Sequence, residues 1–370
     1  MFKYKPIIKL VISSLMLISL FVKKNFASDL IYYKNILDRE DKIFELDMDK
    51  GKKRGIPSID NFLKRSNVVE NKLIFAKFDN IKKGYAFYIY NLVNGTKRFL
   101  FMFLDDKKIT NIYFSPEIDY VFFSSANFLD KPNIIKVYKF SLKTDEMSLI
   151  FKYEKKGAFH NIDYLTLLQN DNILIKFYQE DIKTQIYIKS VDIKSGKVKD
   201  LISINSDYLK VFSLSSNKHF LVYHPNNGME KSVELGLVHI YNFKENKDFT
   251  LVNKKSKKSS LTIIGQFIWS KDSKNLIYTE AKGYYDDVSR DFVLEEDNQI
   301  KSISITGKSI PEVVLNSPIN YNIVDVWKEY NNSYLCLVYN KSKNEWELVL
   351  LNKNGNIEKE LEKGRLIRVY

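Results

Sequence analysis

The chain has 370 residues, of which 45% are hydrophobic and 14% aromatic, so it can bury a large core and does not have the composition of a disordered protein. Lys and Arg exceed Asp and Glu by 13, but the excess is spread along the chain. No basic stripe with a readable nucleic-acid motif is present, so we expect no nucleic-acid partner. The 25 Phe and 24 Tyr, together with many Ile and Val residues, favour strands over helices.

The first 28 residues are predicted to lie outside the folded domain. Lys3, Lys5 and Lys9 precede an apolar run of 13 residues, Leu10 to Val22, and Ala27 and Ser28 offer small residues for cleavage. This run has the length of a signal-peptide core and is short for a membrane span. Residues 1–28 are therefore interpreted as a signal peptide or an uncleaved N-terminal anchor, and residues 29–370 as one domain. The five lysines of the leader leave an excess of +8 on residues 29–370.

A recurring hairpin follows, in which an alternating strand runs into a polar turn and then into a second strand. The turns are marked by Gly51, Gly95, Asp145, Gly196, Asn246, Gly307 and Gly355. Gly, Asn and Asp suit the positive φ that tight hairpin turns require. The markers lie 44 to 61 residues apart. A period near fifty residues is typical of propeller blades, each a four-stranded antiparallel sheet that stacks on its neighbours. We therefore predict an all-β propeller of seven blades.

A second repeated element precedes several of these hairpins. An aromatic residue and a Ser lead into a polar turn and then into an apolar strand. Its copies are Trp269 to Tyr278, Phe114 to Phe123 and Phe212 to Tyr223, with a looser copy from Trp327 to Tyr339. The copy at Trp269 resembles the repeat of TolB-like β-propellers, where an aromatic-Ser-Pro-Asp-Gly-Lys run precedes an apolar strand. The resemblance covers roughly residues 70 to 360 at the level of the repeat, and it implies a propeller fold.

An acidic segment, Lys282 to Asn298, falls inside the longest repeat. Exposed aromatic rings beside charges are common at recognition surfaces. The segment is a candidate partner-binding loop, and the residues proposed for this role are Tyr284, Tyr285, Asp286, Asp287, Phe292, Glu295 and Glu296. A solvated hairpin loop and a Ca²⁺ site are the alternatives, although the spacing is not that of the helix-loop-helix calcium loop. A third possibility is that Phe292, Val293 and Leu294 pack on the blade as a lengthened strand.

The C-terminal part of the chain makes two further predictions. Cys336 lies in an apolar run, Tyr334 to Tyr339, and is interpreted as a buried strand thiol. As the single cysteine of the chain it excludes an intramolecular disulfide. Leu366 to Tyr370 forms a spare strand after the seventh blade, and the first blade lacks a strand at its N-terminal side. We therefore expect the C-terminal strand to complete the first blade and close the ring.

No catalytic, metal or cofactor motif is evident. The chain holds no Gly-x-Ser-x-Gly nucleophile elbow, and His160, His219, His224 and His239 form no close-spaced metal pair. Structural or surface roles are expected for these four, and no cofactor is predicted.

Two functions from different classes remain. The first is a non-catalytic, protein-binding scaffold of the bacterial cell envelope. It would be periplasmic or envelope-associated, with an unknown envelope protein as partner and a possible membrane tether through residues 1–28. The alternative is a glycan-acting hydrolase or lyase with a site at the propeller channel, built from carboxylates scattered in the sequence. A channel mouth lined by Lys, Asn and aromatic residues would favour the scaffold, and converging acidic pairs would favour the enzyme.

Overall fold

A computed structural model describes most of the chain between residues 30 and 369. The described residues are 30–35, 43–47, 52–56, 68–69, 72–104, 108–115, 118–126, 133–155, 159–168, 171–180, 184–206, 208–226, 237–251, 261–286, 291–294, 298–306, 310–363 and 367–369. They form antiparallel strands joined by turns. Within this part of the chain, no helix is long and apolar enough to cross a membrane.

The described strands make seven antiparallel sheets, named A to G here in chain order. Sheet A holds β1 (Leu30–Asn35), β2 (Ile43–Asp47), β3 (Lys52–Ile56) and β29 (Ile367–Val369). Sheet B holds β4 (Val68–Val69), β5 (Lys72–Asp79), β6 (Gly84–Asn91) and β7 (Lys97–Phe103). Sheet C holds β8 (Lys108–Ser115), β9 (Tyr120–Ala126), β10 (Asn133–Ser141) and β11 (Met147–Lys155). Sheet D holds β12 (Phe159–Leu167), β13 (Asn172–Glu180), β14 (Gln185–Asp192) and β15 (Val198–Asn205).

The remaining three sheets follow the same plan. Sheet E holds β16 (Tyr208–Leu214), β17 (Phe220–Asn226), β18 (Val238–Asn242) and β19 (Lys247–Leu251). Sheet F holds β20 (Leu261–Trp269), β21 (Asn275–Asp286), β22 (Asp291–Leu294), β23 (Gln299–Ser304) and β24 (Glu312–Asn316). Sheet G holds β25 (Tyr321–Tyr330), β26 (Ser333–Asn340), β27 (Glu345–Asn352) and β28 (Ile357–Lys363).

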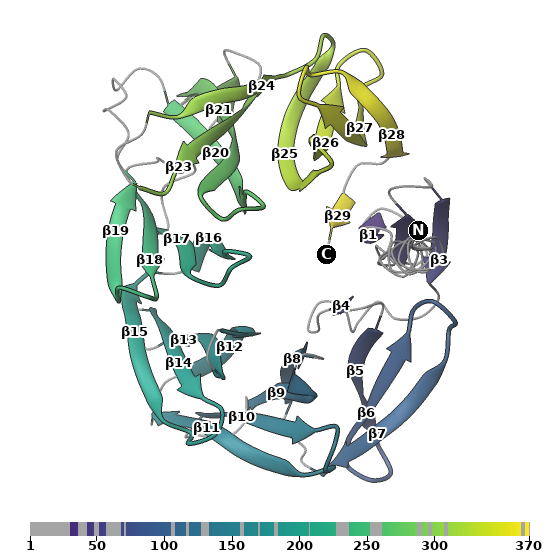
Figure 1. Ribbon diagram of the computed structural model, residues 1–370, viewed down its shortest axis with the longest axis vertical. Helices are drawn as coiled ribbons and strands as arrows, with labels where there is room; N and C mark the ends of the chain where they lie inside the picture. Colours follow the sequence, from purple (N-terminus) through teal and green to yellow (C-terminus); the bar gives the residue numbers. More distant parts are fainter. Residues whose placement is uncertain are drawn as a thin grey trace, which may run out of the picture.

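The sheets surround a central opening, with β4, β8, β12, β16, β20, β25 and β29 as the inner strands (Figure 1). The predicted all-β propeller is confirmed. The C-terminal strand β29 pairs with β1, aligning Tyr33 with Val369 and Asn35 with Ile367. The first sheet therefore contains both ends of the described chain, and the predicted closure by the C-terminal strand is confirmed.

The repeated turns have one local cause. In the connection between the third strand and the outer strand, φ is positive at Gly95, Asp145, Gly196, Asn246 and Gly355. The third strand ends in a side chain that accepts backbone N–H groups of the turn, and these residues are Asn91, Ser141, Asp192, Asn242 and Asn352. Such local hydrogen bonds favour a turn over continued strand. The markers Gly51 and Gly307 lie outside the described residues.

The aromatic-Ser element turns the chain from the inner strand into the second strand. Ser270 Oγ accepts the N–H of Asn275 at 3.0 Å and donates to Asp272 Oδ1 at 2.6 Å. Ser215 accepts the N–H of Phe220 in the same way, at 2.9 Å. The aromatic residue before Ser270 is Trp269, whose Nε1 donates to the backbone oxygen of Ser213 at 3.2 Å. This repeat therefore closes a turn and joins sheet F to sheet E.

The core lies between neighbouring sheets rather than at the centre of the ring. One cluster joins sheets C and D around Ile135, Phe151 and Phe177, and another joins sheets F and G around Ile300 and Cys336. Each sheet thus buries apolar side chains on the faces it presents to its neighbours, as blade stacking requires. Cys336 is fully buried, and burial raises the pKa of its thiol well above the usual value. The interpretation of Cys336 as a buried strand thiol is confirmed.

Candidate functional site

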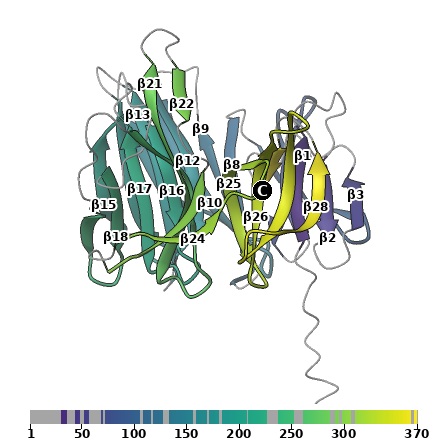
Figure 2. The ribbon, with the colours of Figure 1, turned by 90° about the horizontal axis from the view of Figure 1, so that it is seen from above.

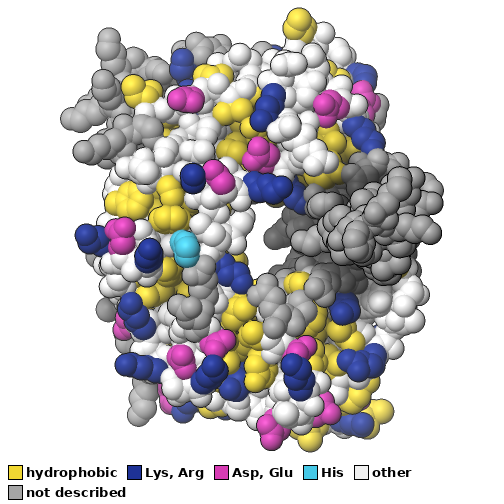
Figure 3. All heavy atoms as spheres, viewed as in Figure 1, with side chains coloured by type: hydrophobic (Ala, Val, Ile, Leu, Met, Phe, Trp, Pro, Cys, Tyr) yellow, Lys and Arg dark blue, Asp and Glu magenta, His cyan; other side chains and the backbone are white. Residues whose placement is uncertain are grey.

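Two of the three connections in each four-stranded sheet lie on one face of the ring. In a four-stranded antiparallel meander, the first and third connections lie at the same end of the strands and the second connection lies at the other. The face that carries the first and third connections is called the turn face here. Figure 3 looks onto this face and shows an opening at its centre with basic side chains at the border. The second connections, including the β21–β22 hairpin, lie on the opposite face (Figure 2).

A cavity of about 660 Å³ lies where the inner strands of sheets E, F and G end on the turn face. We call it the central cavity. It is lined by Ser213, Leu214, Ser216, Phe267, Ile268, Trp269, Lys271, Trp327, Lys328, Glu329, Tyr330, Asn331 and Asn332. Aromatic, Asn and Lys residues thus dominate the lining. Glu329 is the one carboxylate among the described residues there.

Two features characterise the wall that sheet G gives to this cavity. β25 and β26 are joined by a two-residue turn, Asn331-Asn332, in which both residues have positive φ, at 44° and 67°. Asn tolerates this conformation better than most residues, and two such residues make the tight hairpin turn that matches strand twist. The indole Nε1 of Trp327 is buried, and among the described residues it has no hydrogen-bond partner. Leaving a buried hydrogen-bond donor unpaired lowers the stability of the fold, so this N–H is a candidate contact for a group that enters the cavity.

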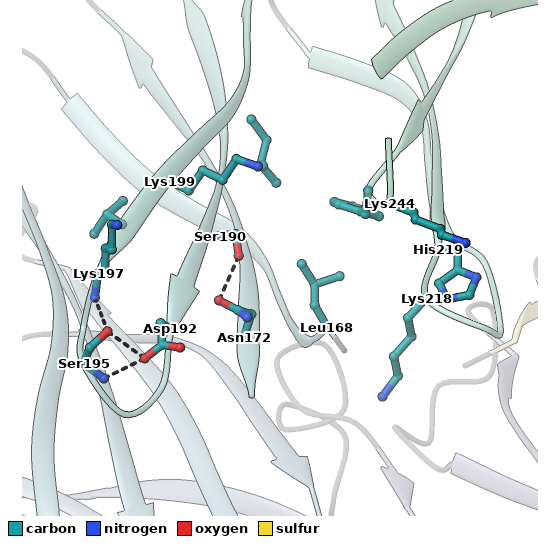
Figure 4. A pocket seen from close by; sticks show the side chains of 13 residues that line it. Leu168, Asn172, Ser190, Asp192, Ser195, Lys197, Lys199, Lys218, His219 and Lys244 are labelled. Carbon is teal, nitrogen blue, oxygen red and sulfur yellow. Dashed lines mark hydrogen bonds between the residues drawn. The ribbon is translucent and has the colours of Figure 1, made fainter. Parts of the chain in front are cut away.

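A second cavity, of about 820 Å³, lies between sheets D and E on the turn face. We call it the lateral groove. Figure 4 shows Lys197 and Lys199 on its sheet D side, opposite Lys218, His219 and Lys244 of sheet E. Its other lining residues are Leu168, Asn172, Ser190, Asp192, Ser195, Val198, Leu201 and Phe243. The groove is therefore basic on both walls, with polar and apolar groups between them.

The one carboxylate among the described lining residues of the groove is Asp192, and it is engaged by its own turn. Asp192 Oδ1 accepts the backbone N–H of Ser195 at 2.6 Å, the hydroxyl of Ser195 at 2.7 Å and the N–H of Lys194 at 3.1 Å. The backbone hydrogen bond from Ser195 is the largest cause that lowers the pKa of Asp192. Asp192 therefore acts as the cap of the β14–β15 turn.

The acidic segment predicted to bind a partner forms a hairpin that extends sheet F. β21 runs on to Asp286 and pairs with β22, aligning Tyr284 with Val293 and Tyr285 with Phe292. Figure 2 shows this hairpin rising above the rest of the ring on the opposite face. The apolar run thus continues the sheet as a short strand. Asp287, Glu295 and Glu296 lie outside the described residues, so partner binding by this segment stays a prediction.

The histidines lie in different surroundings. His219 lines the lateral groove. His224 is fully buried, with Nδ1 3.1 Å from the backbone oxygen of Leu237, and His239 Nδ1 lies 3.3 Å from Asp248 Oδ2. Within the described ranges, no three His, Cys, Asp or Glu side chains come together as a metal-ligand group.

Sequence reasoning did not find either cavity. Lys197, Lys218 and Lys244 stand in three separate turns, and a lysine in a turn is normally a solvated surface residue. The lysine cluster that the sequence does show, Lys254 to Lys258, lies outside the described residues. The central cavity had a signal in the repeat itself, because Trp269 and Trp327 hold its aromatic position.

Comparison with known proteins supports the fold. No family model matches the chain, and no curated protein matches it. An oligogalacturonate lyase in complex with manganese is similar in structure, with a TM-score of 0.51 and 11% identity over 86% of this chain and 83% of the lyase. The β-propeller domain of the Trilobed protease from Pyrococcus furiosus has a TM-score of 0.51 and 13% identity over 90% of this chain and 93% of that domain. TolB from Acinetobacter baumannii has a TM-score of 0.38 and 11% identity, over 88% of this chain and 77% of TolB. By fold, the chain is a β-propeller.

Proposed function

We propose that this chain is a non-catalytic binding scaffold of the bacterial cell envelope, which binds a protein partner at the central cavity. The observation that carries the proposal is the lining of that cavity by Trp269, Trp327 and Tyr330 beside Asn331, Asn332 and two lysines. Aromatic residues are enriched among the side chains that dominate binding energy in protein interfaces. The lining contains the Lys, Asn and aromatic residues that favour a scaffold over an enzyme.

The walls of the cavity are held by the fold before any partner binds. Trp269 is 8% exposed, stacks on Phe220 with 6.1 Å between ring centroids and is tied to Ser213 by its indole N–H. The turn of sheet E is tied to that of sheet F by a hydrogen bond from the N–H of Asn217 to Ser273 Oγ, at 3.2 Å. A preorganised site loses less conformational entropy on binding, so a partner side chain can enter with little rearrangement.

A glycan-acting hydrolase or lyase is the second candidate. It is favoured by the fold shared with an oligogalacturonate lyase and by the basic lateral groove, whose charge suits an acidic sugar. Glycoside hydrolysis by the common mechanisms uses a pair of carboxyl groups at one site. The described lining of each cavity holds one, Glu329 in the central cavity and Asp192 in the lateral groove. One carboxylate in each lining, where glycoside hydrolysis uses two, supports the scaffold over the hydrolase.

The envelope location in this proposal comes from residues 1–28, which have the pattern of a signal peptide or anchor. An uncleaved leader would tether the ring to the membrane and a cleaved one would release it. The β21–β22 hairpin is a second candidate contact for the same or another partner. It lies on the opposite face from the central cavity (Figure 2), so the two contacts can be separated by experiment.

Site-specific photo-crosslinking in intact cells tests the proposed function. A photoreactive phenylalanine analogue in place of Lys271 or Asn332, which are exposed and line the central cavity, should give one discrete protein adduct shared by both positions. The control position is Phe99, which is 52% exposed on the outer strand of sheet B, and it should not give this adduct. The same adduct from Phe99, or none from the cavity positions, would contradict binding at the central cavity.

A further inference from the structure

The lateral groove carries basic side chains on both walls, and Asp192 is the one carboxylate among its described lining residues. Several lysines elsewhere in the ring form ion pairs, such as Lys176 with Asp163 at 2.6 Å, Lys194 with Asp171 at 2.7 Å, and Lys301 with Glu280. By contrast, Lys197, Lys199 and Lys244 form no ion pair with any described residue. Like charges on facing walls repel each other. An anion that enters the groove would reduce this repulsion and lower the electrostatic free energy.

The volume of the groove is large enough for a small-molecule ligand. The groove volume of about 820 Å³ falls within the range of small-molecule sites, which is about 300 to 1,000 Å³. Leu168, Leu201 and Phe243 offer apolar surface there. Asn172 and Ser190 offer amide and hydroxyl groups, and Ser190 Oγ donates to Asn172 Oδ1 at 3.3 Å. These groups suit a molecule that carries anionic groups on a body with both hydroxyl groups and apolar faces.

The geometry of β15 determines how an occupant would meet sheet D. Lys199 pairs across the sheet with Ser190, and both line the groove. Lys197 directly precedes β15, and it lines the groove together with Val198 and Lys199. Successive residues of a strand point to opposite faces, so the groove takes in side chains from both faces at the start of β15. An occupant would therefore meet basic and apolar side chains in alternation there.

We propose that the lateral groove is a binding site for an anionic oligosaccharide, a sugar chain that carries carboxylate or phosphate groups. Lysine ammonium groups bind either anion as point charges. The groove therefore selects a negatively charged ligand but does not distinguish a carboxylate from a phosphate. Sugar hydroxyl groups would hydrogen-bond to Asn172 and Ser190, and a sugar face would cover Phe243. The groove and the central cavity share no lining residue, so ligand binding at one can be tested independently of partner binding at the other.

Isothermal titration calorimetry of the full chain tests this site with four probes of similar size. They are an oligouronate trisaccharide, a phosphorylated maltotriose, unmodified maltotriose and a hexaglutamate peptide. Binding of one or both anionic sugars, with none of unmodified maltotriose, is expected. The variant K197Q/K244Q removes one lysine from each wall and should weaken anionic-sugar binding by about tenfold or more, which is the effect of about 1.4 kcal/mol.

The matched control is K274Q/K353Q, which removes the same charge from exposed turn lysines of sheets F and G that line neither cavity. It should leave the affinity within about twofold, a free-energy change of about 0.4 kcal/mol. An equal loss in both variants would show non-specific charge attraction and would overturn the proposal. Tighter binding of hexaglutamate than of either anionic sugar would instead assign the groove to an acidic peptide. Failure of both anionic sugars to bind would also overturn it.

Discussion

Deletion of residues 366–370 is expected to abolish cooperative unfolding of the ring or to cause aggregation. The deletion removes β29, the inner strand of sheet A, which pairs with β1 through Tyr33, Lys34 and Asn35. The edge of β1 would then be unpaired, and the ring would lose the contact that joins its two chain ends. We expect a loss of at least about 3 kcal/mol, in the range of the largest single structural lesions. Thermal melting followed by circular dichroism, with size-exclusion chromatography, measures both outcomes.

The control for this deletion is R368A, which shortens one side chain of β29 and leaves its backbone pairing with Lys34 in place. It should melt close to the unmodified protein. If the deletion variant melts cooperatively at the same temperature as the full chain, closure of the ring by β29 does not hold it together.

The second large effect is expected at Gly265, where the inner strand of sheet F passes close to its neighbours. A Cβ at this position would lie 2.1 Å from Thr279 Oγ1 and 3.1 Å from Asp325 Oδ1. Thr279 is 2% exposed and its hydroxyl donates to the backbone oxygen of Val324 at 3.3 Å, so it cannot move aside freely. Overpacking of this kind costs about 1 to 3 kcal/mol, and G265A should be destabilised by that amount in urea unfolding.

A double-mutant cycle identifies the cause. In G265A/T279A the hydroxyl is gone and the nearest remaining side-chain carbon of Thr279, Cβ, lies at an ordinary contact distance of 3.5 Å. The double variant should therefore be more stable than the sum of the two single changes predicts, by about 1 kcal/mol. Additive losses would place the cost of G265A elsewhere, and an unchanged midpoint for G265A would contradict the close approach itself.

The fold was predictable because it is repeated. Asn, Asp or Gly at each turn and alternation in each strand recur at nearly constant spacing, and a sequence pattern of that kind reports local structure directly. The closing strand was predictable because few residues precede the hairpin at Ile43 and a spare strand, Leu366 to Tyr370, follows the last hairpin. The β21–β22 pairing was one of several possibilities that the sequence left open, because Tyr284 and Phe292 do not by themselves show whether the chain folds back on the sheet.

The cavities were not predictable, because each combines side chains that the ring alone brings together. Lys197 and Lys244 are 47 residues apart in the sequence and line one groove because sheets D and E are neighbours. Trp269 and Trp327 likewise come from adjacent sheets. A sequence repeat predicts the position of each residue within its own sheet. It does not mark which turn lysines lack an acidic partner, since pairing depends on which side chains neighbouring strands and turns bring together.

Hydrogen–deuterium exchange of the full chain, with and without the protein captured by crosslinking from Lys271 or Asn332, tests the binding site most directly. Bound protein should slow amide exchange in residues 213–219, 267–274 and 327–333, which surround the central cavity on the turn face. Exchange at the β21–β22 hairpin should change less, because it lies on the opposite face (Figure 2). Protection confined to residues 283–294, or no protection around the central cavity, would contradict the proposal that this propeller binds its partner there.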